Sequence, residues 1–585
     1  MKGQGKTDMN NIKNGNLNKY RRIGDLSMNK LMEFLPATIM NSLSTLLLIS
    51  IDGLMVGNFM GEEALAAVSV FSPLTTLIGA FTVLVSYGIS TSLSTSIGKN
   101  EDAQIRQIKG ASFWLMVYLA VVATIIQIPI VWVLMKAYRL PDDIYTLAWQ
   151  YAFGIMIATP LGLISSVGAN MLQIVGKMKL LIKLTVMEGS INLVLDLVFV
   201  GMLQMGTAGA GLGTACANLV RCSTTVIYLL KYTDMLNYRR YRNTFAEYIS
   251  ILRLGVPDSV YSLVYAFQNY CMMQILLLVF AEDAGTVDGV CVFCFSTVNV
   301  LISGILAAMR PMVGLLTGAG DRTGLKILMR QGAWLMALMV GAATAVVELF
   351  PRFFYAIHGV DEFPQGAMAA VRINALFFLP YAFSVYLLIF LVNKKDSQYT
   401  TKITLAGNIS QPVFALGLMF ILSPPWVYLS KSITSVLVLI LYWRRLKHVS
   451  AVDMAETENI GDVVLYMSVR KEEAVEASRA IRSYAEECGI DPKISYRIAL
   501  CMEEMVAYIE SVNEKKIAAQ IIVRFRESGE AVFVIMDNGK CIALQKEQEQ
   551  QKGLSTDNFV LMQRLAKSIK YEYVLDMNYT ILEFE

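Results

Sequence analysis

Charged residues are scarce in this sequence. Asp, Glu, Lys and Arg together make up 17% of the 585 residues, whereas 55% are hydrophobic, and the mean hydropathy is +0.50. A soluble protein of this length needs more polar surface to face water, so the composition predicts a chain whose solvent is the lipid bilayer. The formal net charge of +3 is too small to indicate a nucleic-acid partner, and we expect none.

Three familiar sequence signals are also missing. Residues 1–30 contain no short apolar segment with a small-residue cleavage site, so we expect the first apolar segment to remain as a membrane anchor. The eight cysteines form no disulfide framework, and Cys291 and Cys294 lie inside an apolar run without a nearby His, which favours packing over metal binding. No Walker-type phosphate loop is present, which argues against a primary pump.

Long apolar runs fill the sequence between residues 31 and 446. Most are about 20 residues or longer, the length that an α-helix needs to cross ~30 Å of hydrocarbon. We interpret twelve of them as transmembrane helices, at residues 31–57, 64–97, 110–135, 144–172, 179–203, 208–230, 249–280, 287–317, 327–351, 365–392, 400–422 and 425–443.

Lys and Arg gather in alternate loops of this pattern. They occur in the N-terminal arm at residues 1–30, in every second loop after it, and in a linker at residues 231–248 that contains Arg239, Arg240 and Arg242. Cytoplasmic loops are the ones that keep basic residues, so both termini are expected to face the cytoplasm.

The two groups of six helices resemble each other, because landmarks recur about 220 residues apart. The matching pairs are Pro36 and Pro257, Pro160 and Pro380, and Gly98 and Gly318. Six helices per copy give both copies the same orientation, so we interpret residues 31–230 as an N-lobe and residues 249–446 as a C-lobe. Two such lobes can open a central cavity to either side of the membrane in turn.

The tail at residues 459–585 has a different pattern, in which short β-type runs alternate with amphipathic helices. We expect strands near residues 463–469, 517–525, 531–536, 569–575 and 579–584, and helices near residues 471–488, 493–512 and 556–567. This order predicts a cytosolic α/β sandwich that is large enough to have its own core.

Ionisable side chains inside a membrane span cost several kcal/mol, so those that persist are functional candidates. Asp52 ends the first span and Asp196 lies within the fifth, one helical turn after Asn192 and on the same face. Together with Thr214 of the sixth span, these oxygen atoms can hold a proton or a small cation. The alternatives are a helix-end position at the interface for Asp52, and helix-to-helix hydrogen bonds for Asn192 and Thr214.

At these residues the sequence resembles the multidrug and toxic compound extrusion (MATE) transporters. The resemblance covers residues 25–445 and rests on residues 51–57, 61–68, 170–177, 192–196 and 209–214. It implies two six-helix lobes and an N-lobe site for H+ or Na+ formed by the residues that match Asp52, Asn192, Asp196 and Thr214. It also implies that organic solutes, cationic or drug-like, are exported.

The C-lobe has no obvious equivalent of this site. Residues 407–412 stand where Asn192 and Asp196 would be matched, and no acid follows them inside the span, so we expect coupling in the N-lobe only. Arg310, beside Pro311, either lines the substrate cavity or pairs with an acid; the alternative is that it caps the helix break. Gln268 and Asn269 are further candidates for the cavity, and helix packing explains them equally well.

The tail resembles the small histidine-kinase-like ATP-binding domains of the anti-sigma-factor kinase type. Asp537 and Gly539, directly after an expected strand, match the motif that recognises adenine, and Glu504 matches the start of the magnesium-binding box. The box then departs from the pattern, because Tyr508 stands in place of the Asn that holds the metal.

The glycine-rich lid over the phosphates is likewise reduced, to Gly553-Leu554 followed by residues 555–559. Without a metal ligand or a lid of backbone N–H groups, binding of ATP and magnesium loses its main supports. The tail is therefore expected to be a non-hydrolysing regulatory or nucleotide-sensing domain.

The leading hypothesis is secondary active export by alternating access, without enzymatic activity or a metal cofactor. The expected partners are the bilayer, a small organic solute and a cytosolic regulator of the tail, and both resemblances point to a bacterial plasma membrane. One alternative is a flippase for a lipid-linked precursor, for which basic residues such as Arg310 would have to line the cavity. Another is a membrane sensor with a kinase tail, against which Tyr508 counts.

Overall fold

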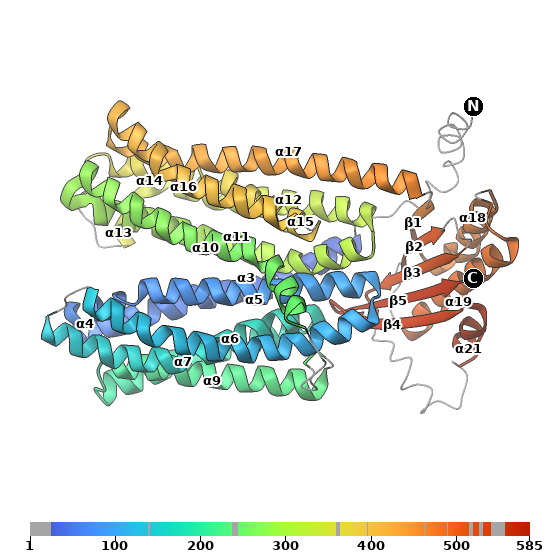
Figure 1. Ribbon diagram of the computed structural model, residues 1–585, viewed down its shortest axis with the longest axis horizontal. Coiled ribbons are helices and arrows are strands. Elements are labelled where there is room, and N and C mark those ends of the chain that lie inside the picture. Colours follow the sequence, from blue (N-terminus) through green and yellow to red (C-terminus); the bar gives the residue numbers. More distant parts are fainter. Residues whose placement is uncertain are drawn as a thin grey trace. The chain divides into compact units, whose positions relative to one another are not determined.

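Figure 1 shows the computed structural model, which describes residues 25–137, 141–233, 235–236, 244–357, 363–394, 396–460, 463–487, 489–513, 519–525, 530–539 and 556–585. The chain forms two compact units. The larger unit comprises Leu31–Ala319 and Met329–Lys447, and the smaller comprises Met1–Lys30, Gly320–Leu328 and His448–Glu585.

Helices make up the region in which membrane spans are expected. Those before residue 240 are α3 (Asp25–Met60), α4 (Glu62–Ser69), α5 (Ser72–Lys99), α6 (Asp102–Ala137), α7 (Asp142–Val175), α8 (Met178–Asp196), the π-helical segment η2 (Leu197–Met202) and α9 (Thr207–Tyr232). Those after it are α10 (Phe245–Phe280), η3 (Ala281–Asp283), α11 (Ala284–Gly318), α12 (Arg322–Leu349), α13 (Pro351–Ile357), α14 (Ala367–Ala375), α15 (Phe378–Asn393), α16 (Ser397–Ile421), η4 (Pro424–Tyr428) and α17 (Leu429–Ile460).

Ten helical segments among the described residues are long and apolar enough to cross a membrane. They agree with the predicted helical membrane fold. Helices α3 and α9 occupy the places of the first and sixth expected spans. Large apolar side chains on the outer face of α6, such as Ile125 and Trp132, are more than half exposed, as expected where lipid is the solvent.

Two of the expected spans are interrupted, each four or five residues before a proline. The span at residues 64–97 is divided into α4, which ends at Ser69, and α5, which contains Pro73 in its first turn. The span at residues 365–392 is divided after Ala375, ahead of Pro380. A proline ring clashes with the carbonyl group four residues earlier and lacks an N–H donor, which is why both helices stop there.

The expected basic linker between the two sets of helices is shorter than residues 231–248. Helix α9 continues to Tyr232, and α10 begins at Phe245 after a capping box, in which the Thr244 N–H donates to Glu247 Oε2 at 2.8 Å. Arg239, Arg240 and Arg242 lie outside the described residues.

Helix α5 joins the two halves, since it packs against both α10 and α11. The contacts are made by backbone atoms. A Cβ atom added to Gly255 of α10 would fall on the Leu84 carbonyl group, and one added to Gly98 would fall on the Leu315 carbonyl group of α11. Glycine is therefore required at these positions, in the way that small residues allow helices to approach closely in membranes.

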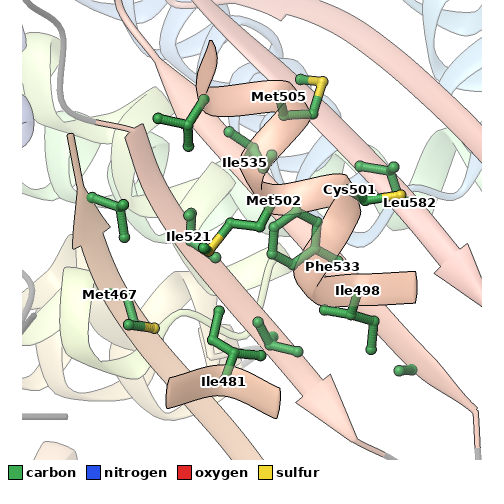
Figure 2. Close-up of a cluster of buried hydrophobic side chains, with 14 of the residues drawn as sticks. Met467, Ile481, Ile498, Cys501, Met502, Met505, Ile521, Phe533, Ile535 and Leu582 are labelled. Atoms are coloured by element: carbon green, nitrogen blue, oxygen red, sulfur yellow. The ribbon is translucent and has the colours of Figure 1, made fainter. Parts of the chain in front are cut away.

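The tail contains a five-stranded antiparallel sheet. In chain order its elements are β1 (Val463–Val469), η5 (Lys471–Glu473), α18 (Ala474–Glu487), α19 (Pro492–Val512), β2 (Ala519–Phe525), β3 (Ala531–Asp537), α21 (Thr556–Leu565), β4 (Ser568–Val574) and β5 (Met577–Phe584), and the strand order is β1-β2-β3-β5-β4. Figure 2 shows the core between sheet and helices, where Met502 of α19 lies among Ile521, Phe533 and Ile481. Side chains alternate between the two faces of a strand, which directs Ile521 of β2 and Phe533 of β3 to the face covered by the helices.

Candidate functional site

The end of α8 carries the strongest candidate of the sequence analysis. Asp196 is the last residue of α8, and the π-helical segment η2 follows it directly. Asp196 and Asn192 are both fully buried. Gly213 of α9 makes room for the carboxylate, since an added Cβ atom would collide with Asp196 Oδ1. A π-helical turn beside a buried acid is a common feature of functional sites in helices.

Three of the four predicted coupling residues come together between α8 and α9. Asn192 Nδ2 donates to Thr214 Oγ1 at 3.2 Å, and the same hydroxyl donates to the Ala210 carbonyl oxygen at 3.2 Å. These bonds join the Asn192 amide to the Thr214 hydroxyl, and the Asp196 carboxylate lies against Gly213 of the same helix α9. Asp52 lies within α3, and its side chain is outside the described part of the structure.

A buried ion pair extends this polar face by one more helical turn. Glu188 lies four residues before Asn192, and its Oε2 accepts a hydrogen bond from Arg221 Nη1 of α9. Arg221 Nη2 also donates to Asn41 Oδ1 of α3 at 2.6 Å. Sequence reasoning missed this pair, although the spacing of four from Glu188 to Asn192 to Asp196 marks one helix face and was available as a signal.

Arg310 has an acidic partner, which was one of its predicted alternatives. Its Nη2 and Nη1 atoms lie 2.8 and 3.3 Å from the two carboxylate oxygens of Asp258 on α10. The guanidinium group also lies over the ring of Tyr87 of α5, 3.8 Å from its centroid. This bidentate ion pair matches the charge of Arg310 inside the protein.

The second half of the helical unit contains a cavity of about 50 Å³. Its lining comes from α10, α15, α16 and α17, and it includes Gln268, Asn408, Lys431 and several tyrosines. Gln268 lines this cavity, whereas Asn269 interacts with Tyr265 on the same helix. Lys431 was missed in the sequence analysis, although it lies inside the expected span at residues 425–443.

Asp537 of the tail lies at the end of β3, and one of its two carboxylate oxygens is hydrogen-bonded by protein groups. Its Oδ1 atom accepts hydrogen bonds from the Gly539 N–H and from Asn578 Nδ2, each at 2.8 Å. Burial raises the pKa of Asp537 above its ordinary value, and these two donors oppose the increase. The carboxylate that would recognise adenine is thus committed to Asn578 of the neighbouring strand β5.

The rest of the predicted nucleotide site does not fit a metal-bound triphosphate. Glu504 is half-buried on α19, and Tyr508 follows one helical turn later as a buried core residue. Within the described residues, no group of three or more His, Cys, Asp and Glu side chains could hold a metal ion. Gly553 and Leu554 of the shortened lid lie outside the described residues.

Known proteins resemble the helical part of the chain. The MatE family model matches residues 36–198 and 262–416, which is more than half of the sequence. A probable multidrug resistance protein, YoeA of Bacillus subtilis, is 25% identical over 308 residues, and a probable multidrug resistance protein NorM of Thermotoga maritima is 23% identical over 304 residues. Each alignment covers 50% of this chain and 65% of the relative, so the chain matches just under two thirds of these relatives' length.

Solved structures show the same fold. An outward-facing multidrug resistance MATE family transporter of the MOP superfamily superimposes with a TM-score of 0.67 at 19% identity, and a MATE protein in a straight conformation with a TM-score of 0.68 at 20% identity. Both superpositions cover 73% of this chain and 97% of the other. With two lobe-sized matches to the family model in one sequence, the chain belongs to the MatE family of multidrug and toxic compound extrusion transporters.

Proposed function

We propose that this protein is a secondary active exporter in which H+ or Na+ moves inward through the N-lobe and drives the outward movement of an organic solute. Asp196 is the residue that carries the charge, and Asn192 and Thr214 supply further oxygen atoms, together with Asp52. Twelve transmembrane helices with both termini in the cytoplasm are part of this proposal. Relatives described as multidrug resistance proteins support drug-like solutes as substrates.

The observation that carries the proposal is the complete burial of Asp196 between α8 and α9. An ionised carboxylate in a low-dielectric environment is costly unless a proton or cation balances it. Loading of the ion therefore removes a large penalty from the state in which the site is closed, and release restores that penalty. This difference allows an ion gradient to favour one arrangement of the lobes over the other.

The neighbouring π-helical turn supports such a role. Residues 197–202 have the wider helical winding directly after Asp196, whereas α8 before it is regular. π-helical turns within helices are rare and occur frequently at functional sites. The change of winding directly after Asp196 therefore supports a functional role for this carboxylate.

The alternatives receive less support. The flippase alternative relied on Arg310 as a basic residue of the cavity, and Arg310 is instead paired with Asp258. A kinase needs a free adenine-recognising Asp and a metal ligand, whereas Asp537 is bonded to Asn578 and Tyr508 belongs to the core. We propose that the tail is a regulatory domain that does not hydrolyse ATP.

Efflux in inverted membrane vesicles tests the proposal. The vesicle lumen corresponds to the cell exterior, so an acidic or a sodium-rich lumen should drive uptake of a fluorescent drug into vesicles that contain the protein. We expect uptake with one of the two gradients and none after the gradient is collapsed with an ionophore. Uptake that depends on ATP but on neither gradient would refute secondary active export.

A further inference from the structure

Lys431 stands out among the charged residues of the helical unit. It lies in the first turn of α17, only 6% of its surface is exposed, and it lines the cavity in the second half of the unit. Buried lysines normally pair with a carboxylate, because an ammonium group without a counter-charge is costly in a low-dielectric environment.

The contacts of Lys431 are aromatic. Its ammonium group lies 5.5 Å from the centroid of the Phe377 ring and 5.3 Å from that of Tyr428. Such cation–π contacts recover about 0.5–2 kcal/mol, which is less than the desolvation cost of a buried charge. Among the described residues no carboxylate lies within 4.0 Å of this ammonium group.

The acids nearest to this region have other partners. Asp288 of α11 accepts a hydrogen bond from the Tyr428 hydroxyl at 3.1 Å. Asp258 of α10 is held by Arg310 in the bidentate pair. Neither acid forms an ion pair with Lys431, although the Asp288 carboxylate shares the Tyr428 side chain with it. Lys431 also lines the cavity, so a ligand bound there would lie beside its positive charge.

The cavity suits a small anion. About 50 Å³ is room for one carboxylate group, one halide ion or a few water molecules. Tyr261 and Tyr381 provide aromatic walls, and Asn408 adds an amide group to the lining. Aromatic walls around a single charged group are typical of sites for amphipathic ligands, with the charge fixing the orientation.

We propose that Lys431 and this cavity form an anion subsite of the second half, which takes the carboxylate head of an amphipathic organic acid. The role of the subsite in transport depends on the proposed export function, whereas binding of the anion does not. The substrates would then include weak organic acids, in contrast to the cationic solutes expected from the sequence.

Equilibrium dialysis with the purified full-length protein in nanodiscs tests the subsite. Radiolabelled benzoate is the probe, in a gluconate buffer free of chloride, and benzylamine is the cationic competitor of the same size. We expect saturable benzoate binding that benzylamine does not displace. Benzylamine displacing benzoate as well as unlabelled benzoate does would overturn the proposal, since the site would not select charge.

Three variants assign the binding to Lys431. Lys431→Gln should weaken benzoate binding by about tenfold or more, and Lys431→Arg should restore most of it because the charge remains. Lys447→Gln, on the same helix but beside Trp443 and outside the cavity lining, is the matched control. Equal affinity in Lys431→Gln and in this control would refute the subsite.

A further variant tests the subsite without a substitution of Lys431, in case those variants do not fold. Asn408→Asp keeps the shape of a lining residue and supplies an internal negative charge, so it should abolish benzoate binding. Retention of full affinity in this variant would contradict the proposal.

Added chloride distinguishes two sources of the anion. Failure of chloride to compete with benzoate supports an organic acid, and competition by millimolar chloride would assign the same subsite to a free halide and refute the organic acid as its ligand.

These outcomes are independent of the efflux assay. Benzoate binding that needs Lys431, combined with no gradient-driven uptake of any solute, would refute the export function and leave the subsite standing. The opposite result is gradient-driven uptake of cationic dyes that is unchanged in Lys431→Gln, without any binding of benzoate. It would refute the subsite and leave the export function standing.

Discussion

The two halves of the helical unit repeat a fold but bury opposite charges. The first half places Asp196, Asn192 and Glu188 along one face of α8, with a single buried Arg221 matched to Glu188. The second half has Asn408 and Gln411 in the corresponding helix α16, and a buried Lys431 one helix later. Helix order thus survives the repetition, whereas the chemistry between the helices has diverged.

On the two proposals made above, this difference assigns a different ligand to each half. A buried carboxylate without an equal number of fixed cations attracts a proton or metal cation, and a buried ammonium group attracts an anion. Gln411 emphasises the contrast, since its amide donates to the Ser430 hydroxyl at 2.6 Å and carries no charge. One lobe is suited to the driving ion and the other to part of the solute.

The largest expected effect comes from neutralising the first half. Asp196→Asn keeps the size of the side chain but cannot lose or gain the proton or pair with Na+, so gradient-driven uptake into inverted vesicles should fall to the level of vesicles without a gradient. Asp52→Asn should weaken uptake in the same direction but less. The measurement is dye uptake at matched amounts of membrane-inserted protein.

Near-normal uptake by Asp196→Asn would contradict the assignment of the driving ion to the first half. Asn408→Asp serves as the reciprocal control in the same assay, because it adds an acid at the corresponding place of the second half. If Asn408→Asp restored gradient-driven uptake to the Asp196→Asn variant, the assignment of the driving ion to the first half would be wrong.

A second test concerns the ion pair that distinguishes the first half. Glu188→Gln leaves the buried Arg221 without its counter-charge, which should cost about 3–5 kcal/mol of stability. Thermal unfolding of the purified protein should show a clearly lowered midpoint. Glu348→Gln, near the end of α12, provides the control, and a midpoint as low as that of Glu188→Gln would contradict a specific role of the pair.

The smallest effect is expected for substitutions in the tail. This test asks whether ATP hydrolysis by the tail, and not an ion gradient, could drive transport. Residues 459–585 have their own hydrophobic core, so the isolated domain should fold and should hydrolyse no ATP above the background of a buffer control. Asp537→Asn should leave this background unchanged, because the carboxylate already serves Asn578 and Gly539. Magnesium-dependent turnover that is lost in this variant would move the driving force from the first half to ATP.

Sequence patterns predicted most helices and strands well, because the length and hydropathy of a segment largely determine which of the two it forms. All strands of the tail lie within two residues of their expected bounds, since apolar alternation marks them directly. The breaks at Ser69 and Ala375 were missed, although Pro73 and Pro380 are visible in the sequence. Proline interrupts some helices and is tolerated inside others, as at Pro160 of α7 and Pro257 of α10, and tertiary contacts decide between the two.

The candidate site was only partly predictable for a related reason. Asn192 and Asp196 share a helix face, which the spacing of four reveals, and their contact with Thr214 followed from the resemblance. The ion pairs Arg221 with Glu188 and Arg310 with Asp258 join residues 33 and 52 positions apart, so no local pattern identifies the partners. Lys431 is unusual only because no acid lies beside it, which is a property of the folded chain.

The glycine contacts of α5 with α10 and α11 set the kind of motion that is available to the two halves. Where the backbones of two helices are in contact, no side chain has to change its rotamer when one helix shifts along the other. The contact itself therefore adds little to the energy barrier of such a shift. The same contact allows no gradual loosening, because an approach that close is either made or lost. We therefore expect α5 to be the place where the two halves move relative to each other. Substituting Gly98 or Gly255 should force α5 away from α11 or α10 and impair this movement, while the proposed sites of the ion and of the solute stay unchanged.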